Sequence, residues 1–460
     1  MTQTQISSAL AYVQNQRERF QDDLKAFVRI PSISTDPNAK ADIRRAADHL
    51  ADRLKGLGFQ KVEISPTKGA PVVTGELMNA GAGKPTVLIY GHFDVQPVEP
   101  LELWHSPAFE AERRGDNLFG RGTSDMKGQI IIVLAAIESL ARTSGMPVNI
   151  KAIFEGEEEV GSPNLEQFII EHKDQLTCDI ALNPDSGMIG EQIPTITYGL
   201  RGMSYLEIRL QGPDHDLHSG SYGGAVHNPA QVLCELIAGM HDAHGRVTLP
   251  GFYDRVRAMD SDERKELARL PMGEAFYLEQ TGVPALYGES GYTVTERVCG
   301  RPTLEVNGLL SGFTDEGQKT VLPAKSMAKI SMRLVPDQDP EEVRQQMAKY
   351  LEAHTPPTVR WELIKHAGSF PSITDRQTPA VVAMSQAMEQ VWGKRPVFKR
   401  EGGSIPVVVH MQQHLGVESV VTGFGLPDDN LHAPNEKIHL PTFYRGIETM
   451  VRYFCILGEK

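Results

Sequence analysis

The sequence predicts an α/β fold: a three-layer domain with a mostly parallel sheet, interrupted by a smaller α+β domain. The chain has 460 residues, more than one compact domain usually holds. Apolar strand-like segments alternate with helix-like segments towards both ends of the chain, which is typical of a buried parallel sheet. In the middle, strand-like segments alternate apolar and polar residues, as in an open sheet. We expect residues 1–199 and 369–460 to form one discontinuous domain, and residues 200–368 to be inserted as a lid.

The elements of the discontinuous domain follow from hydrophobic periodicity. Residues 6–28 have the pattern of an amphipathic helix. A buried helix is expected over "DMKGQIIIVLAAIESLART", with Ser124 and Asp125 as capping residues, and "PTFYRGIETMVRYFCIL" predicts a closing helix. Four apolar runs predict strands: "PTVLIYGHFD", "VNIKAIFE", "CDIALNPD" and "VESVVTGFG".

The inserted domain shows four strand patterns and two clear helices. One expected helix is "NPAQVLCELIAGMH", with Pro229 in its first turn, and the other is "DPEEVRQQMAKYLEAH". Gly199, Gly202 and Gly368 lie where hinges would be needed. The expected strands are "MSYLEIRLQG", "TLEVNGL", "KSMAKISMRLVP" and "TVRWELIKHAG".

Composition argues against several classes of partner. The net charge of −13 disfavours nucleic acid and anionic membranes. The longest apolar run has 8 residues, whereas a membrane-spanning helix needs about 20, and the N-terminal segment lacks the apolar core of a signal peptide. The 4 cysteines occur singly, as reduced thiols do in cytosolic proteins. We therefore expect a cytoplasmic protein that binds neither nucleic acid nor membrane.

Acidic residues and histidines follow the apolar strands. His92 and Asp94 end one strand, Asp185 ends another, and His432 follows the last; Asp125 precedes the buried helix. Ligands bind at the carboxyl ends of strands in open α/β sheets, so these side chains should converge. Imidazoles with several carboxylates suit Zn²⁺, Mn²⁺ or Co²⁺ better than Ca²⁺ or a thiolate cluster. A pair of ions sharing one carboxylate would activate a water and polarise a carbonyl, and a further carboxylate would carry the proton.

Each of these signals also has an ordinary interpretation. A His-x-Asp pair is often a capped surface pair, adjacent glutamates are common on solvated loops, and Asp185 suits a turn. The repeated placement after apolar strands is what favours a metal site. In the acidic stretch "FEGEEEVGSPN", composition leaves open whether the working pair is Glu157–Glu158 or Glu158–Glu159.

Eight blocks of the sequence, in order, resemble the M20 metallopeptidase family. The similarity is greatest to its dipeptidase branch, which includes carnosinase-like and Cys-Gly dipeptidases, because Asp185 stands at the third ligand position and the inserted domain is long. The resemblance implies a metal-dependent dipeptidase; an N-acyl amino acid deacylase or carboxypeptidase of the same family is the alternative, and a non-catalytic binding protein of the same fold is a third. The blocks are "GHFDVQP", "GRGTSDMKG", "EGEEEVGS", "NPDSG", "DLHSGSYGGAVHNP", "SMRLVP", "EGGSIP" and "NLHAPNE".

The resemblance also implies a set of metal ligands. His92, Asp125 and Asp185 would hold one divalent ion. Asp125, Glu159 and His432 would hold the second, with Asp125 shared. Zn²⁺ is the expected ion, with Mn²⁺ or Co²⁺ as alternatives.

The family pattern distinguishes the neighbouring glutamates. The Gly161-Ser162 pair aligns Glu158 with the general base and leaves Glu157 at a variable position. Asp94 would orient the imidazole of the preceding metal-binding histidine through its other ring nitrogen.

Five further residues of the chain match substrate-binding positions of the family. His218 would reach the active site of the other subunit and stabilise the oxyanion, which implies a homodimer through the inserted domain. Arg333 would bind the carboxylate of a small peptide substrate, and Thr320 occupies a matching position. Gly403 and Ser404 would hold the substrate's terminal carboxylate. The ordinary interpretations are a helix-flanking histidine, a strand-end salt bridge and a turn that needs positive φ.

Overall fold

The computed structural model describes residues 3–403 and 405–459, and the chain divides into two compact units. The first unit comprises Met1–Tyr198, Thr374–Phe398 and Pro406–Lys460. The second unit comprises Gly199–Ile373 together with Lys399–Ile405. The sequence places the limits of the inserted domain at residues 200 and 368.

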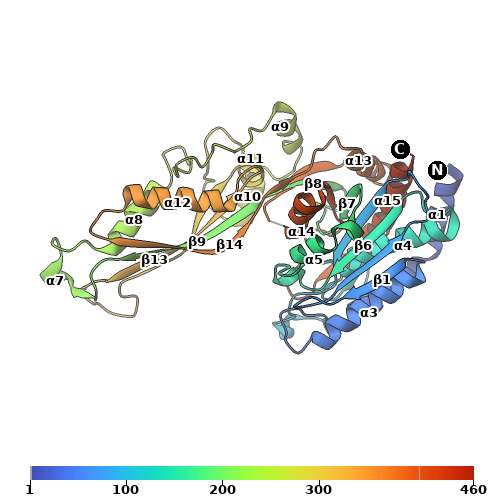
Figure 1. Cartoon of the computed structure of the whole chain (residues 1–460), viewed down its shortest axis with the longest axis horizontal. Helices are drawn as coiled ribbons and strands as arrows, with labels where there is room; N and C mark the ends of the chain where they lie inside the picture. The colour runs from blue at the N-terminus through green and yellow to red at the C-terminus, as the bar shows by residue number, and fades with distance from the viewer. Residues whose placement is uncertain (1–2, 404, 460) are drawn as a thin grey trace. The chain divides into compact units, whose positions relative to one another are not determined.

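The chain contains a nine-stranded mixed sheet, of which β1, β2, β3, β6, β7 and β17 lie wholly in the first unit (Figure 1). Its strand order is β1-β2-β6-β3-β7-β17-β8-β15, and β16 pairs with β8. The sheet is parallel from β6 to β17 and antiparallel on both sides of that centre. The strands are β1 Gln60–Ser65, β2 Val72–Leu77, β3 Thr86–His92, β6 Asn149–Glu155, β7 Ile180–Asn183, β8 Thr195–Leu200, β15 Ser372–Ile373, β16 Val397–Glu401 and β17 Ser419–Thr422.

Helices cover both faces of this sheet. A Cβ atom added to Gly75 of β2 would lie 3.3 Å from Leu54 of α3, whereas the neighbouring Thr74 accepts a hydrogen bond from Gln175 of α6. Successive strand residues point to opposite faces, so α3 and α6 lie on opposite sides, which confirms the expected α/β layers. The helices are α1 Gln3–Asn15, α2 Arg17–Val28, α3 Lys40–Gly56, α4 Lys127–Thr143, α5 Leu165–Glu171, α6 Lys173–Leu176, α13 Pro379–Trp392, α14 Pro406–His410 and α15 Leu440–Gly458.

Short elements complete the first unit. A three-stranded sheet has the order β18-β5-β4, and short helical turns lie between the longer elements. These elements are β4 Glu112–Arg114, β5 Asn117–Phe119, β18 Lys437–His439, the 3₁₀ turns η1 Leu101–Leu103 and η2 Glu158–Val160, and the π-helical turn η3 Met411–Leu415.

Two predictions about helix ends are wrong. The segment expected as one helix over residues 6–28 is two helices, α1 and α2, which meet at Gln16. The bend lets Tyr12 of α1 and Arg19 of α2 both donate to the buried Glu138 of α4. The start of α4 is also different: its N-cap is Met126, without a side-chain cap, because the preceding Ser124 and Asp125 have tertiary partners instead.

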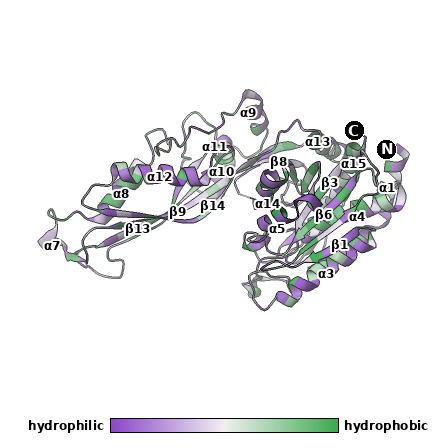
Figure 2. Ribbon diagram, viewed as in Figure 1, coloured by the Kyte–Doolittle hydropathy of each residue, from purple (hydrophilic) through white to green (hydrophobic). Residues whose placement is uncertain are grey.

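The second unit contains a four-stranded antiparallel sheet with the order β11-β13-β9-β14. Helices α8 and α12 pack on it, and each begins with a proline after a capping Asn228 or Asp339. The amphipathic α12 buries Val343, Met347 and Leu351, while hydrophilic residues occupy its other face (Figure 2). The elements are β9 Gly202–Gln211, β10 Leu217–His218, β11 Thr303–Ser311, β12 Val321–Leu322, β13 Lys325–Leu334, β14 Arg360–Ser369, α7 Ser219–Tyr222, α8 Pro229–Gly239, α9 Ser261–Leu267, α10 Glu274–Thr281, α11 Val294–Gly300 and α12 Pro340–His354.

Within residues 3–403 and 405–459, no helix is both long enough and apolar enough to cross a bilayer. The four cysteines, Cys178, Cys234, Cys299 and Cys455, are free thiols.

Candidate metal centre

The carboxyl ends of the central parallel strands lie at one edge of the sheet in the first unit. His92 is the last residue of β3, Glu155 is the last residue of β6, and Asp185 follows β7. The segment after β17 leads to His432. Because these strands are parallel, the residues that follow them gather at this edge, where open α/β sheets bind ligands.

The five predicted metal ligands form two groups that share Asp125. One group is His92, Asp125 and Asp185, and the other is Asp125, Glu159 and His432; the ligand atoms of each group lie within 4.8 Å of one another. Oδ1 of Asp125 lies 3.0 Å from Nε2 of His92, and Oδ2 lies 3.0 Å from Nε2 of His432. The two oxygens of one carboxylate therefore face two imidazoles, as bridging of two ions requires.

The donor atoms of each group fit a divalent ion. In a tetrahedral zinc site with bonds of about 2.0–2.2 Å, neighbouring ligand atoms lie about 3.3 Å apart. Nε2 of His432 lies 3.3 Å from Oε2 of Glu159, and Nε2 of His92 lies 3.9 Å from Oδ1 of Asp185. Mixed imidazole and carboxylate donors suit Zn²⁺, Mn²⁺ and Co²⁺. The assignment of these five residues as ligands stays a prediction.

Several buried carboxylates lie close together at the carboxyl ends of the parallel strands. Burial, together with the Asp125 carboxylate, raises the pKa of Glu159 to about 7. Burial also raises the pKa of Asp185 well above its ordinary value. For Asp125 burial acts in the same direction, but hydrogen bonds from His432 and His92 outweigh it and lower its pKa. A divalent ion would be the largest local charge and would favour the ionised form of all these carboxylates.

Asp94 connects His92 to the turn that follows β6. Its Oδ1 accepts a hydrogen bond from the backbone N–H of Glu158 at 3.2 Å, and its Oδ2 accepts one from Glu159 at 3.0 Å. Nδ1 of His92 donates to the Asp94 carbonyl at 3.1 Å and lies 3.5 Å from Oδ1 of the same residue. A proton on Nδ1 leaves the lone pair of Nε2 free to bind a metal ion.

Two of the four glutamates in the acidic stretch have structural partners. The buried Glu155 accepts hydrogen bonds from Tyr90 at 2.7 Å and Ser162 at 2.9 Å, and burial raises its pKa to about 8. Glu157 accepts a hydrogen bond from Asn164 at 2.8 Å. Both carboxylates point to partners outside the two ligand groups.

The other two glutamates, Glu158 and Glu159, occupy one 3₁₀ turn but have different surroundings. Glu159 contacts His432 and accepts a hydrogen bond from Gln96 at 2.8 Å. The half-buried Glu158 has no side-chain hydrogen bond or ion pair to any described residue, and burial raises its pKa. Gly161 ends the turn at φ 88°, a conformation that glycine adopts without strain. The turn thus presents one carboxylate to the ligand group and leaves its neighbour available to exchange a proton.

Sequence reasoning does not single out Glu436, which organises the segment that carries Asp125. This buried carboxylate accepts hydrogen bonds from the Arg121 guanidinium at 2.8 Å and from the N–H of Gly122 at 2.9 Å. It also accepts from the N–H groups of Ser124 at 3.0 Å and Asp125 at 3.1 Å. Its only sequence signal is its place at the end of "NLHAPNE", a stretch that has the composition of a loop.

The second unit brings His218 and Thr320 together. Strand β10, which ends at His218, pairs with β12, and Oγ1 of Thr320 lies 3.4 Å from Nε2 of His218. His218 also caps α7, because its Nδ1 accepts the N–H of Gly220 at 3.0 Å. An accepting Nδ1 places the proton of the neutral ring on Nε2. The exposed imidazole therefore presents an N–H donor, as stabilisation of an oxyanion requires.

Arg201 and Arg333 line a cavity of about 400 Å³ in the second unit, together with Arg297, Arg301, Glu289 and Glu305. Arg333, near the end of β13, and Arg201 have no ion-pair partner within the part of the chain that the structure describes. Burial, reinforced by the positive charge of Arg333, lowers the pKa of Arg201. Sequence reasoning missed Arg201. Glu289 of this cavity pairs with Arg301, which leaves the guanidiniums of Arg201 and Arg333 as the groups suited to an anion.

The predicted Gly403–Ser404 loop is described only in part. Gly403 does not have positive φ, and a Cβ atom there would meet no other atom within 4 Å. Neither conformation nor packing therefore demands glycine, and the ordinary interpretation as a strained turn does not hold at this position. Ser404 lies outside the described residues.

Comparisons with known proteins cover nearly the whole chain. The profile described as "Peptidase family M20/M25/M40" matches residues 88–455. The chain is 30% identical to a Cys-Gly metallodipeptidase of Candida albicans over 97% of this chain and 96% of that protein. It is 28% identical to the human Beta-Ala-His dipeptidase over 99% of this chain and 93% of that protein. Among solved structures, a metallo-carboxypeptidase from Sulfolobus solfataricus superposes with a TM-score of 0.82 at 33% identity, covering 95% of this chain and 98% of its own.

Replacing Glu436 tests whether it positions the predicted metal ligands. Glu436→Gln should weaken metal binding by about 10- to 100-fold, the usual effect of losing a hydrogen-bond partner that orients a ligand. The amide would place a donor against backbone N–H groups and the Arg121 guanidinium. Chelator competition measures the affinity. Asp428→Asn is the control, because Asp428 lies on the same segment, is 74% exposed and contacts Lys437; equal affinity of both variants would contradict the positioning role.

Proposed function

The chain belongs to peptidase family M20/M25/M40, and on this basis we propose that it is a dipeptidase that works with two divalent metal ions. The observation that carries the proposal is Asp125, whose two oxygens face the histidines of two separate ligand groups. Relatives named as Cys-Gly and Beta-Ala-His dipeptidases match almost from end to end, which supports a dipeptide as the substrate.

His92, Asp125 and Asp185 would hold one ion, and Asp125, Glu159 and His432 would hold the other. Zn²⁺ is the ion we propose, with Mn²⁺ and Co²⁺ as alternatives that suit the same donors. When bound, the ions supply Lewis acidity, which polarises the scissile carbonyl and acidifies a water.

Glu158 would carry the proton of the reaction. Its carboxylate is held next to a metal ligand on η2 and is not engaged by any described side chain. It can accept the proton of the attacking water and then donate it to the leaving nitrogen. Asp94 supports this role by fixing the backbone N–H of Glu158.

Residues of the second unit would recognise the substrate. Arg333, with Arg201 beside it, would bind the free carboxylate of the dipeptide, because a guanidinium pairs with both carboxylate oxygens. The Gly403–Ser404 loop would add further donors to that carboxylate, and Thr320 would hold the substrate beside His218. A substrate without a free carboxylate leaves these cations unpaired.

We also propose that the protein is a homodimer through its second unit. The edge strand β11 exposes Val306 (40%), Leu309 (56%) and Leu310 (56%), and an exposed apolar edge strand is a ready surface for a second copy. In such a dimer the Nε2–H of His218 of the partner subunit would stabilise the oxyanion. The four free thiols support the expected location in a reducing compartment, the cytoplasm.

Carboxypeptidase activity is the alternative that a specific observation favours. The metallo-carboxypeptidase from Sulfolobus solfataricus is 33% identical to this chain. Both activities release a residue with a free carboxylate, so the arginines suit either. They differ in the peptide length accepted on the amino side of the scissile bond. An N-acyl amino acid deacylase would have the same ligands and base.

A substrate panel tests the activity. We expect dipeptides to be hydrolysed with a higher kcat/KM than tripeptides, longer peptides or N-acetyl amino acids that share the same terminal residue. Dipeptide amides should be poorer by about 10- to 100-fold, because each loses a charged hydrogen bond to arginine. Preference for longer peptides would indicate a carboxypeptidase, and preference for N-acetyl amino acids a deacylase.

Replacement of the proposed base separates its role from that of a ligand. Glu158→Gln should lower kcat by about 100- to 10,000-fold, the usual contribution of a general base, while elemental analysis finds both metal ions still bound. Glu157→Gln is the matched control and should keep normal activity, since an amide oxygen still accepts from Asn164. Loss of metal from Glu158→Gln, or equal damage in the control, would reverse the assignment.

Mixed dimers test whether His218 acts on the neighbouring subunit. Neither His218→Ala nor Glu158→Gln homodimers should be active. A heterodimer of one chain of each kind should regain activity, because one of its two sites then combines an intact Glu158 with the His218 of the partner subunit. Differently tagged, co-purified chains provide the sample. A heterodimer as inactive as the parents would show that His218 does not act across the dimer.

A further inference from the structure

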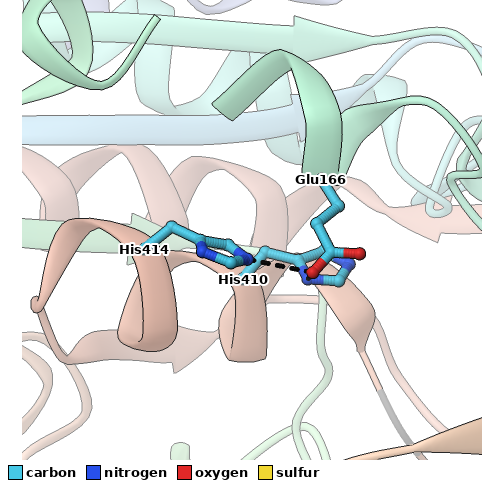
Figure 3. Close-up of side chains that lie close together, drawn as sticks. All are labelled: Glu166, His410 and His414. Carbon is cyan, nitrogen blue, oxygen red and sulfur yellow. Dashed lines mark hydrogen bonds and ion pairs between the residues drawn. The ribbon is translucent and has the colours of Figure 1, made fainter. Parts of the chain in front are cut away.

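A second group of metal-ligating side chains lies apart from the ligand groups around Asp125. Glu166 of α5, His410 at the end of α14 and His414 of η3 come together within the first unit, where α14 and η3 pack against α5. Figure 3 shows the carboxylate of Glu166 pointing from its own helix towards the two imidazoles, which project side by side from the neighbouring one. None of the three belongs to the proposed active site.

The distances in this group match those of ligands on one ion. Oε1 of Glu166 lies 2.9 Å from Nε2 of His414 and 3.7 Å from Nδ1 of His410. One ligand atom from each residue lies within 4.8 Å of the others. Ligand atoms around a tetrahedral zinc ion are about 3.3 Å apart, so small side-chain rotations suffice to close the group on a metal ion.

The two histidines are prearranged by the helical turn. Residues four apart lie on the same face of a helix, and the rings of His410 and His414 are stacked 21° apart with centroids separated by 6.2 Å. π-helical turns such as η3 are frequently found at functional sites.

An ordinary ion pair does not account for the whole group. Such a pair would explain the contact between Glu166 and His414, but Nδ1 of His410 is buried and has no hydrogen-bond partner among the described residues. A buried ring nitrogen without a partner is costly unless something binds it. Burial, opposed in part by Glu166, lowers the pKa of His410, which favours the neutral ring that binds metal ions.

We propose that Glu166, His410 and His414 form an additional metal site, which binds one divalent transition-metal ion of the zinc, cobalt, nickel or copper class. Two imidazoles and one carboxylate suit these ions, whereas Mg²⁺ and Ca²⁺ prefer oxygen donors alone. Water completes the coordination at the exposed side. The ion ties α5 to the α14–η3 segment, two parts of the chain that are distant in sequence.

A metal count on the full chain tests this site. Wild-type protein and the double variant His410→Gln/His414→Gln are dialysed against the same Zn²⁺ buffer, and zinc per chain is measured by elemental analysis. The wild type should retain one zinc ion more per chain than the double variant, whatever the occupancy of the other two sites. Equal counts would overturn the proposal and leave a hydrogen-bonded ion pair.

A control histidine and an activity assay make the result specific. His172→Gln should keep the wild-type zinc count, because Nδ1 of His172, near Glu166 in the chain, already donates to the Phe168 carbonyl at 2.9 Å. Hydrolysis of dipeptides should be unchanged in the double variant, since the additional site is separate from the proposed active site. Absence of dipeptidase activity in the wild type would reject the proposed function but not the extra zinc ion.

A milder substitution keeps the test decisive if the double variant folds poorly. Glu166→Gln retains an acceptor for His414 but removes the anionic ligand. It should lower the affinity for the additional zinc ion by at least the roughly tenfold that loss of an outer hydrogen-bond partner costs. An unchanged affinity in this variant would overturn the proposal equally.

Discussion

The Asp125 carboxylate has to face two histidines that lie far apart in the chain, and much of the first unit meets this one constraint. His92 comes from the end of β3, whereas His432 lies 307 residues after Asp125. Glu436 accepts hydrogen bonds from the N–H of Asp125 and from three residues that precede Asp125 in the chain. Glu436 belongs to the same C-terminal segment as His432. The buried Glu436 therefore holds the segment that carries Asp125 against the segment that carries His432. The carboxyl ends of the central parallel strands bring His92 to the same place.

Opposite hydrogen bonds at Nδ1 suit two histidines to opposite roles. Nδ1 of His92 donates to a backbone carbonyl, so Nε2 is the ring nitrogen that would bind a cation in place of its hydrogen bond to Asp125. Nδ1 of His218 accepts from a backbone N–H, which leaves a proton on Nε2. The first ring is suited to bind a cation and the second to bind developing negative charge. In each case, a backbone group within two residues of the histidine decides the chemistry of the side chain.

The sequence predicts candidate site residues where they directly follow a strand that is recognisable by its apolar run. The strands ending at His92 and Glu155 are long apolar runs, so their existence and the polar residues after them were predictable, and the family profile confirms the resemblance seen in the eight blocks. Such prediction fails where a side chain has a distant partner. Serine is a common helix-capping residue, but the hydroxyl of Ser124 donates to Asp429 instead. Glu436 lies in a stretch without hydrophobic periodicity. Its hydrogen-bond donors are more than 300 residues away in the chain, and its separation from Asp125 is 311 residues. Of the antiparallel pairs at the two sides of the sheet, only β1 and β2 follow from a short connection, whereas β2–β6 and β8–β17 join strands that are distant in the sequence.

The position of β17 has a consequence for synthesis of the chain on the ribosome. This strand, residues 419–422, lies between β7 and β8 in the sheet, although both of its neighbours are complete by residue 200. Until the whole inserted unit has been translated, β7 keeps an unpaired apolar edge, and such edges are prone to aggregate. His432 follows β17 in the chain, so the proposed second ligand group is complete only after β17 has been translated. Loading of the proposed second ion would therefore follow translation of β17, and a nascent chain that stalls before residue 419 carries four of the five proposed ligands and lacks His432.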